Sequence, residues 1–281
     1  MGALFLGGDL RQKYASDFMY KNKVESEVFI NFDLDEKMQA KINSASIIGL
    51  PIPLFNKDMY LNMDNNNSIR LEDILLFLNE GCLVCGGNIP NHIRENILLH
   101  HCCFMDYLEV ESFQINNALL SAEGAIYYAK QRLEQSIHSS NIAILGFGRI
   151  GKLLAYLLQL QGAKITICTR KESDYAWSKL AGFKGFKIKT FGNESNLKMI
   201  DNKYDIIFNT IPSWVMDESF VEKLDNETLI IDVASYPFGI DESLVKKYNL
   251  KYFRESGIPG RYAPQSAGEI IAQTIIDYIH K

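Results

Sequence analysis

Short apolar runs alternate with longer amphipathic stretches along the first hundred residues of the chain. The apolar runs have the length of β-strands, and the stretches between them place apolar residues at the spacing of a helix. Such strand–helix alternation predicts a parallel sheet with helices on both faces. The expected strands cover residues 3–8, 27–32, 45–53, 82–87 and 102–107, and the expected helices residues 11–21, 70–81 and 91–101.

A longer helical pattern follows, and after it the alternation starts again. Residues 110–138 contain no proline and a single glycine, so we expect one long helix that connects two domains. The fold class predicted is therefore α/β, with two doubly wound parallel-sheet domains. We expect residues 1–114 to form an N-terminal, substrate-side domain, with the last helix, 264–281, packing back on it. Residues 115–263, including the connecting helix, would form a dinucleotide-binding Rossmann domain.

Composition and charge narrow the class of protein. The chain has 281 residues and a net charge of −5, which argues against a general nucleic-acid surface. No stretch approaches 18 uninterrupted apolar residues, and the start has no basic segment typical of a signal peptide, so we expect a cytoplasmic protein without a membrane span.

The five cysteines raise the question of a metal site. Cys82 and Cys85 have a spacing found in zinc sites, and residues 100–103 read His-His-Cys-Cys. Both segments also look like short buried strands, in which residues three apart point to opposite faces. We therefore expect these cysteines to be buried apolar residues, and we predict no metal.

A glycine-rich turn is the first candidate for a binding site. Residues 146–151 match the pattern G-x-G-x-x-G, following an apolar strand and opening an amphipathic helix, which is the context of a dinucleotide fingerprint. The first glycine would allow the tight turn, the second the approach of a pyrophosphate, and the third close packing of helix on strand. The alternative is a glycine-rich turn that binds no nucleotide. The candidate residues are Gly146, Gly148, Arg149, Ile150 and Gly151.

The end of the next strand bears on which dinucleotide is bound. Enzymes that use NAD usually carry a carboxylate there, whereas this chain has Thr169, Arg170 and Lys171. Two cations and a hydroxyl suit a 2′-phosphate, so we predict NADP. Glu172 is the competing residue, and NAD is the alternative cofactor.

Two later strand ends are candidates for the nicotinamide side. The segment Asn209, Thr210, Ile211, Pro212 ends one predicted strand, and Ala234 follows the next. Ligands of open α/β sheets bind outside the carboxyl ends of the strands. The alternative is that these residues only form turns.

The first domain offers a second candidate site. Gly8, Asp9 and Arg11 follow the first strand, where they could bind an anion or a substrate facing an interdomain cleft, although Asp9 could merely cap the next helix. Glu123 stands beside Gly124 inside the connecting helix, where glycine is unfavourable unless something approaches closely. The alternative is a solvated glutamate.

The motifs together resemble one family. "GGDLR", "AEGAI", "LGFGRIG", "NTIP", "IDVAS" and "GIPGRYAPQSAGEI" occur in the order and spacing of the A subunit of dipicolinate synthase. The resemblance covers nearly the whole chain and implies the fold of the formate/glycerate dehydrogenases. It also implies an NADP-linked oxidoreductase that makes pyridine-2,6-dicarboxylate during sporulation, in the cytoplasm of the mother cell, with a flavoprotein-like B subunit. The chain departs from the family where "AS" is often followed by "PGG", since here Ser235 precedes Tyr-Pro-Phe-Gly.

The chemistry that this resemblance implies assigns roles to the candidate residues. A dihydropyridine dicarboxylate becomes aromatic when it loses a hydride and a proton, so binding the dianion matters more than a strong acid–base pair. We expect Arg261, in the segment 257–270, to bind one carboxylate with help from Ser266 at the helix start, and Arg11 to bind the other. Asp9 and Glu123 are the catalytic candidates.

Other functions stay open from the sequence alone. One alternative is a non-catalytic NADP-binding component of a flavoprotein complex, and another is a shikimate- or hydroxy-acid-type dehydrogenase. We also consider that the chain forms a homo-oligomer.

Overall fold

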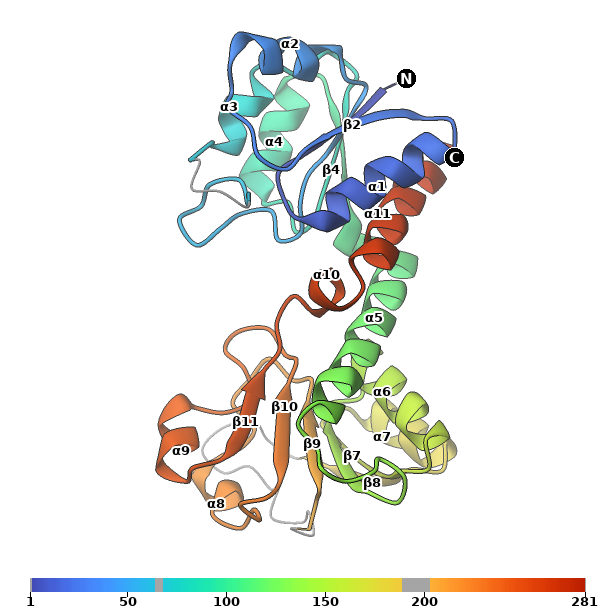
Figure 1. Cartoon of the computed structure of the whole chain (residues 1–281), viewed down its shortest axis with the longest axis vertical. Helices are drawn as coiled ribbons and strands as arrows, with labels where there is room; N and C mark the ends of the chain where they lie inside the picture. Colours follow the sequence, from blue (N-terminus) through green and yellow to red (C-terminus); the bar gives the residue numbers. More distant parts are fainter. Residues whose placement is uncertain (1, 64–67, 189–202, 281) are drawn as a thin grey trace. The chain divides into compact units, whose positions relative to one another are not determined.

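The structure is a computed structural model that describes residues 2–63, 68–188 and 203–280 (Figure 1). The chain divides into two compact units. The first comprises Met1–Asn117 together with Pro259–Lys281, and the second comprises Ala118–Ile258. Helix α5 (Glu111–Lys130) contributes residues to both units, which are described one at a time below.

The first unit contains a five-stranded parallel sheet. Its strand order is β2-β1-β3-β4-β5, and every neighbouring pair runs parallel. Because the pairs are parallel, all the loops that follow the strands lie at the same edge of the sheet. The strands are β1 (Gly2–Leu6), β2 (Glu25–Phe29), β3 (Ile47–Gly49), β4 (Leu83–Gly86) and β5 (Cys103–Asp106).

Both faces of this sheet are covered by helices, and the side chains of each strand alternate between two cores. Leu4, Ile48 and Val84 are aligned on neighbouring strands and face the core under α2 (Glu36–Ser44), α3 (Leu71–Leu75) and α4 (Asn91–Leu99). Ala3 and Phe5 face the opposite core, which is covered by α1 (Leu10–Lys21), α11 (Pro264–Ile279) and the start of α5. The short helix η1 (Tyr107–Glu109) follows β5.

The same alternation explains the cysteine pair. Cys82 is buried in the core under α2, α3 and α4, whereas Cys85 is buried in the opposite core. The two thiols therefore lie on opposite faces of the sheet and cannot bind one ion together. No group of three or more potential metal ligands occurs within residues 2–63, 68–188 and 203–280.

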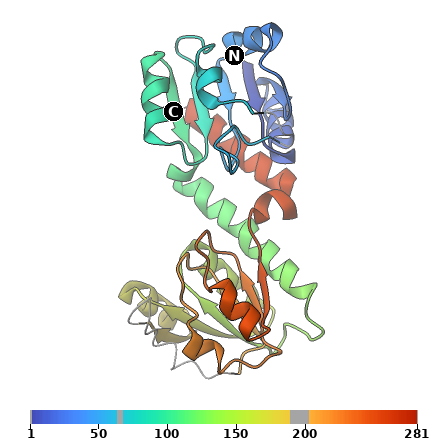
Figure 2. The same cartoon turned by 90° about the vertical axis from the view of Figure 1, so that its left-hand side faces the viewer.

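The last helix packs on the first one, and both views show α11 beside α1 (Figures 1 and 2). At the closest approach, a Cβ built on Gly268 would lie 2.5 Å from the backbone oxygen of Arg11 and 2.9 Å from the backbone nitrogen of Ala15. Only glycine fits this crossing, so Gly268 fixes how the start of α11 sits over the start of α1.

The second unit contains a six-stranded parallel sheet with the order β11-β10-β9-β6-β7-β8. The chain builds outward from β6 to β8, then returns to the other side of β6 with β9, so the order reverses between β6 and β9. The strands are β6 (Asn141–Leu145), β7 (Lys164–Thr169), β8 (Lys184–Lys187), β9 (Ile206–Asn209), β10 (Leu229–Asp232) and β11 (Lys251–Arg254). The helices are α6 (Arg149–Leu160), α7 (Glu172–Leu180), α8 (Glu218–Val221) and α9 (Glu242–Lys247).

The two parallel sheets confirm the predicted fold class. Several element boundaries were nevertheless wrong. The helix predicted for residues 110–138 ends at Lys130, and there Arg132 leaves the helix to pair with Glu255 (2.7 Å) and lie over the ring of Phe253 (4.3 Å). A tertiary ion pair and a ring contact thus end a pattern that helical spacing alone would continue.

One other segment was also misjudged. The helix predicted for residues 70–81 is only α3, because Phe77 and Leu78 turn inward and pack against the core beneath it. The segment before the last helix, which holds Arg261, contains a short helix, α10 (Ile258–Tyr262). Gly257 has a positive φ of +61°, whereas Gly260 lies inside α10, where its missing side chain allows close packing.

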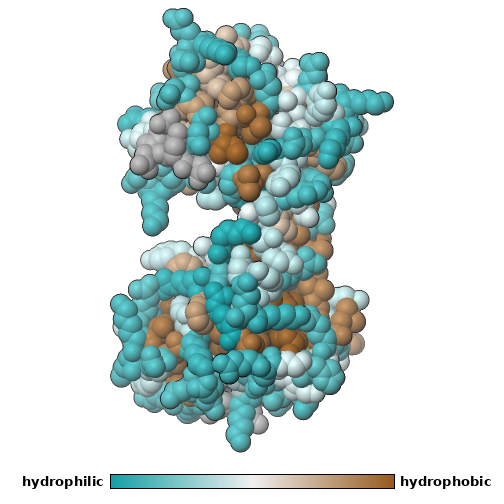
Figure 3. Space-filling view, viewed as in Figure 1, coloured by the Kyte–Doolittle hydropathy of each residue, from teal (hydrophilic) through white to brown (hydrophobic). Residues whose placement is uncertain are grey.

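No helix in the part of the chain that the structure describes is long and apolar enough to cross a membrane. The face drawn in Figure 3 mixes polar side chains (teal) with smaller apolar areas (brown).

Candidate active site

The glycine-rich turn of the second unit joins β6 to α6 at the edge where the strand order reverses. Gly146 has φ +98°, and its N–H donates to the carbonyl of Cys168 at 2.8 Å. A Cβ at this position would lie 2.3 Å from Oγ1 of Thr210. Both the backbone conformation and the space therefore require glycine.

The other two glycines of the turn differ in what surrounds them. A Cβ on Gly151 would lie 2.2 Å from the backbone oxygen of Gly146, so the absence of a side chain lets α6 pack directly on the turn. Gly148 is the N-cap of α6 and has an ordinary φ of −75°, and a Cβ there would meet no atom of the described residues within 4 Å. Nothing in the fold requires glycine at 148, and the open space lies beside the N-terminus of a 12-residue helix. These features fit a pyrophosphate, which needs close approach to backbone N–H groups.

The residues predicted to select the cofactor lie at the end of β7. Thr169 is its last residue and is buried, whereas Arg170 and Lys171 are exposed. Glu172, the competing carboxylate, accepts a hydrogen bond from the ammonium group of Lys187 at the end of β8. The carboxylate thus already has a cation for a partner, which makes it a poorer acceptor for a ribose hydroxyl.

The turn after β9 is held by its own side chains. The backbone N–H and the hydroxyl of Thr210 both donate to the carbonyl of Leu145 at 2.9 Å. The amide of Asn209 is fully buried, and its oxygen accepts from the N–H of Ile211 at 3.1 Å. These polar side chains shape the turn, so the turn presents mainly backbone, Ile211 and Pro212 to its surroundings.

In the first unit, Asp9 and Arg11 form a two-pronged ion pair at the start of α1. Nε of Arg11 donates to Oδ1 of Asp9 (2.9 Å), Nη2 donates to Oδ2 (2.8 Å), and Nη2 also donates to the carbonyl of Ile52. The Arg11 side chain is only 11% exposed, against 46% for Asp9. Burial opposes ionisation of Asp9, but the hydrogen bonds and charge of Arg11 outweigh it and lower the pKa of the carboxyl group.

This pairing changes the role expected of Asp9. Its Oδ1 also accepts from the backbone N–H of Arg11 at 3.0 Å, so Asp9 caps α1 as well. Because both oxygens bind the arginine, the geometry suits Asp9 to orienting Arg11 rather than to abstracting a proton.

Helix α10 covers the same ion pair. A Cβ on Gly260 would lie 2.8 Å from Nε and 3.0 Å from Cζ of Arg11, so only glycine lets α10 come this close. Arg261 is the next residue and is exposed, and Ser266 is exposed in the first turn of α11. Gly8, with φ +78°, completes the turn before Asp9. The structure therefore brings these predicted substrate residues together around the start of α1.

Glu123, the other catalytic candidate, is half-buried on α5, in the part of the helix that belongs to the second unit. The Asp9–Arg11 pair belongs to the first unit.

Sequence reasoning missed Asp232 and Tyr252. Asp232 is the last residue of β10, and its buried carboxylate accepts hydrogen bonds from Asn209, Ala234, Gly239 and Tyr252. The sequence does contain a sign of this network. An aspartate at the end of the apolar run "LIID" is expected to be buried, and a buried carboxylate needs hydrogen-bond donors around it.

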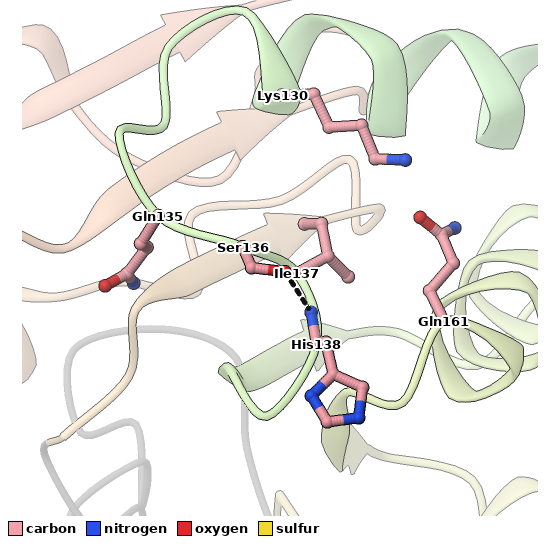
Figure 4. A pocket seen from close by; sticks show the side chains of 6 residues that line it. All are labelled: Lys130, Gln135, Ser136, Ile137, His138 and Gln161. Carbon is pink, nitrogen blue, oxygen red and sulfur yellow. Dashed lines mark hydrogen bonds between the residues drawn. The ribbon is translucent and has the colours of Figure 1, made fainter.

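A separate pocket of about 440 Å³ lies between the end of α5 and the end of α6, away from the glycine-rich turn (Figure 4). The ammonium group of Lys130 points toward the amide of Gln161, and the backbone N–H of His138 donates to Oγ of Ser136 at 3.2 Å. None of the predicted site residues lines this pocket, whose lining consists of Lys130, Gln135, Ser136, Ile137, His138 and Gln161.

The two-unit α/β fold of this chain is also found in D-lactate dehydrogenases. It is similar to the apo-structure of D-lactate dehydrogenase from Escherichia coli, with 14% identity and a TM-score of 0.65, covering 100% of this chain and 96% of that one. The family described as ketopantoate reductase PanE/ApbA matches residues 142–231, which include the glycine-rich turn and the strand ends discussed above.

Two further comparisons match A subunits of dipicolinate synthase. The A subunit of dipicolinate synthase from Bacillus subtilis (strain 168) is 31% identical over 195 residues, which make up 69% of this chain and 63% of that protein. The crystal structure of the same subunit from Bacillus halodurans is 25% identical, with a TM-score of 0.85, covering 100% of this chain and 98% of that one. The chain is a homologue of the dipicolinate synthase A subunit, which confirms the resemblance drawn from the motifs.

Proposed function

We propose that the protein is an NADP-dependent oxidoreductase that converts dihydrodipicolinate, or its hydrated precursor, to pyridine-2,6-dicarboxylate. The observation that carries the proposal is the contrast within the glycine-rich turn. Gly146 and Gly151 are required by the fold, whereas Gly148 is required only if a ligand approaches it. Together with the homology to the A subunit of dipicolinate synthase, this supports a bound dinucleotide and a pyridine dicarboxylate product.

The cofactor would be held along the carboxyl edge of the second sheet. In this proposal, the glycine-rich turn binds the pyrophosphate and the end of β7 binds the 2′-phosphate, because exposed cations there suit a phosphate dianion. The turn after β9 and the residue Ala234 then face the nicotinamide, which accepts a hydride when the cofactor is bound. The residues concerned are Gly146, Gly148, Arg149, Ile150 and Gly151, then Thr169, Arg170 and Lys171, then Asn209, Thr210, Ile211, Pro212 and Ala234.

The dicarboxylate would be bound by the two arginines of the first unit. Asp9 and the carbonyl of Ile52 occupy Nε and Nη2 of Arg11, which leaves Nη1 to donate to a substrate carboxylate. Arg261, with Ser266 and the start of α11, binds the other carboxylate, while Gly8, with φ +78°, forms the turn that leads into Asp9 and Arg11. A guanidinium fixed by a carboxylate loses little further entropy when it binds its ligand.

The reaction itself needs little from the protein beyond positioning. A ring C–H bond breaks and its electron pair leaves as hydride to the cofactor, while a ring proton is transferred to a base or to water. Aromatisation of the ring supplies driving force, so a half-buried carboxylate is a sufficient base. We assign this role to Glu123, and we assign to Asp9 the orientation of Arg11.

The relative in Bacillus subtilis supports a proposal on the cellular setting. That relative is the A subunit of its enzyme, which implies a second, B subunit. We therefore propose that this chain acts with a flavoprotein-like B subunit in the mother cell during sporulation.

The test is an activity assay on the purified chain. The chain is incubated with NADP⁺ and freshly made dihydrodipicolinate, with and without the B subunit, and the ultraviolet absorbance of dipicolinate is followed. We expect product to form only when NADP⁺ is present. Binding of NADP⁺ without turnover in either arm would instead indicate a non-catalytic nucleotide-binding protein.

A further inference from the structure

The carboxylate of Asp232 ties together three neighbouring strands of the second unit, β9, β10 and β11. Its side chain is 1% exposed. Oδ1 accepts from Nδ2 of Asn209 (2.9 Å) and from the N–H of Ala234 (3.0 Å), and Oδ2 accepts from the N–H of Gly239 (2.7 Å) and the hydroxyl of Tyr252 (2.8 Å). Four donors around one buried carboxylate satisfy it fully, and such charge-assisted bonds are strong.

These bonds join the loop after β9 and the loop after β10 into one block. Asp232 binds both ends of the loop 234–239, through Ala234 and Gly239. The carbonyl of Gly239 in turn accepts from the N–H groups of Val215 (2.9 Å) and Met216 (3.0 Å) in the other loop. A Cβ on Gly239 would lie 2.3 Å from Nδ2 of Asn209, so the block closes only around a glycine.

The outer side of this block carries aromatic rings. Tyr236 is 82% exposed and packs edge-to-face on Phe238, with ring centroids 6.0 Å apart. Phe238 is held from behind by the guanidinium of Arg254, 4.2 Å from the ring centroid, and Arg254 donates to Glu242 at 2.6 Å. The fold therefore fixes an exposed aromatic side chain whose own burial contributes little to stability.

The location of the block decides what the ring would meet. In an open sheet with this strand order the dinucleotide lies across the reversal, with the adenosine toward β7 and the nicotinamide toward β9 and β10. Tyr236 follows β10, so it is on the nicotinamide side and far along the sheet from the adenosine.

We propose that Tyr236 is a specificity-determining residue that recognises the flat, six-membered heterocycle of the substrate by ring contact. This inference rests on the proposed function, because it takes the substrate to be a dihydropyridine. A planar π-system pairs favourably with an aromatic ring in an offset or edge-to-face arrangement. An aliphatic hydroxy acid presents no such face, so a fixed tyrosine at this position favours a ring substrate.

The experiment compares Tyr236→Ala and Tyr236→Phe with the unchanged chain, in the presence of the B subunit if turnover needs it. Tyr236→Ala should raise KM for dihydrodipicolinate about 2- to 12-fold, which corresponds to losing the interaction of one aromatic pair. It should raise the inhibition constant of dipicolinate by the same factor. The dissociation constant of NADP⁺ should stay within about twofold, because the contact is to the substrate ring. Tyr236→Phe keeps the ring and should behave like the unchanged chain.

A matched control is Tyr20→Ala, which removes another strongly exposed tyrosine, near the C-terminal end of α1. It should leave both constants unchanged. An unaltered KM in Tyr236→Ala would overturn the inference while leaving the proposed function intact. An equal loss of NADP⁺ affinity, or loss of binding to the B subunit with KM unchanged, would also overturn it, since the ring would then serve the cofactor loop or a partner surface. Failure of the unchanged chain to oxidise the dihydropyridine would overturn the proposed function as well.

Discussion

Replacing two glycines of the same turn by alanine should separate folding from binding. Gly146→Ala forces a side chain into a backbone with φ +98° and places its Cβ 2.3 Å from Oγ1 of Thr210. Strain of this kind costs about 1–3 kcal/mol, and overpacking costs about as much again. Alanine also restricts the unfolded chain, which returns about 0.4–1 kcal/mol. The net loss of stability should therefore be at least about 1 kcal/mol, which lowers Tm by at least about 2 °C in a domain of this size.

Gly148→Ala should behave in the opposite way. Its φ of −75° suits alanine, and the added Cβ would meet nothing within 4 Å, so Tm should be unchanged or slightly higher. A pyrophosphate against this backbone would, however, collide with the new methyl group. Overpacking of about 1–3 kcal/mol weakens binding about 5- to 140-fold.

The assay combines thermal unfolding followed by circular dichroism with calorimetric titration of NADP⁺. If Gly148→Ala bound NADP⁺ as tightly as the unchanged chain, no phosphate would lie against Gly148, and the dinucleotide site would have to be sought elsewhere. An unshifted Tm for Gly146→Ala would contradict the geometry of the turn itself.

Three further predictions address the cofactor, the substrate and the ion pair between Asp9 and Arg11. Arg170→Ala should weaken NADP⁺ binding by about 1.5–3 kcal/mol, the value of a charged hydrogen bond, and NAD⁺ binding much less; equal losses by calorimetry would show that Arg170 does not bind the 2′-phosphate. Arg261→Ala should lower kcat/KM strongly and Arg261→Lys partly, because lysine keeps the charge without the two-pronged geometry; near-normal kcat/KM in the alanine variant would rule out carboxylate binding by Arg261. Asp9→Asn should lower Tm at pH 7. The pKa of Asp9 is lowered in the folded chain, so its ionised carboxylate stabilises the fold fully above the unfolded pKa of about 3.9. This stabilisation is lost as the pH falls through the lower folded pKa. The difference in Tm between the unchanged chain and Asp9→Asn should therefore narrow below about pH 4. A difference independent of pH would contradict the pairing with Arg11.

The fold could be predicted from the sequence where a residue pattern is compatible with only one kind of local structure. An apolar run of strand length followed by glycine and an amphipathic stretch has few folded solutions, so both parallel sheets and the glycine-rich turn could be predicted. Gly151 shows why, since its Cβ would meet the backbone oxygen of Gly146 at 2.2 Å.

Prediction failed where distant residues decide a local outcome. Helical spacing continues past Lys130, yet the ion pair between Arg132 and Glu255 joins residues 123 positions apart and ends the helix. The same holds for Gly260, whose role depends on the contact between α10 and the side chain of Arg11. A glycine in a loop-like segment suggests an unusual φ, whereas here the missing side chain makes room for a guanidinium.

Asp232 illustrates a different limit of prediction from sequence. The segment "DVASYP" drew attention to Ala234 as a residue at a strand end, because sequence reasoning looks for side chains that could face a ligand. The aspartate faces inward and acts through the backbone of both loops, accepting from Ala234 and Gly239 and, through Asn209, steadying Ile211. A buried acceptor of this kind leaves no spacing pattern, since its donors come from two other strands, β9 and β11, and from the loop after β10. Its substitution should therefore disturb every residue proposed for the nicotinamide side at once, and this is why Tyr236, which lies outside the network, is the sharper probe of substrate recognition.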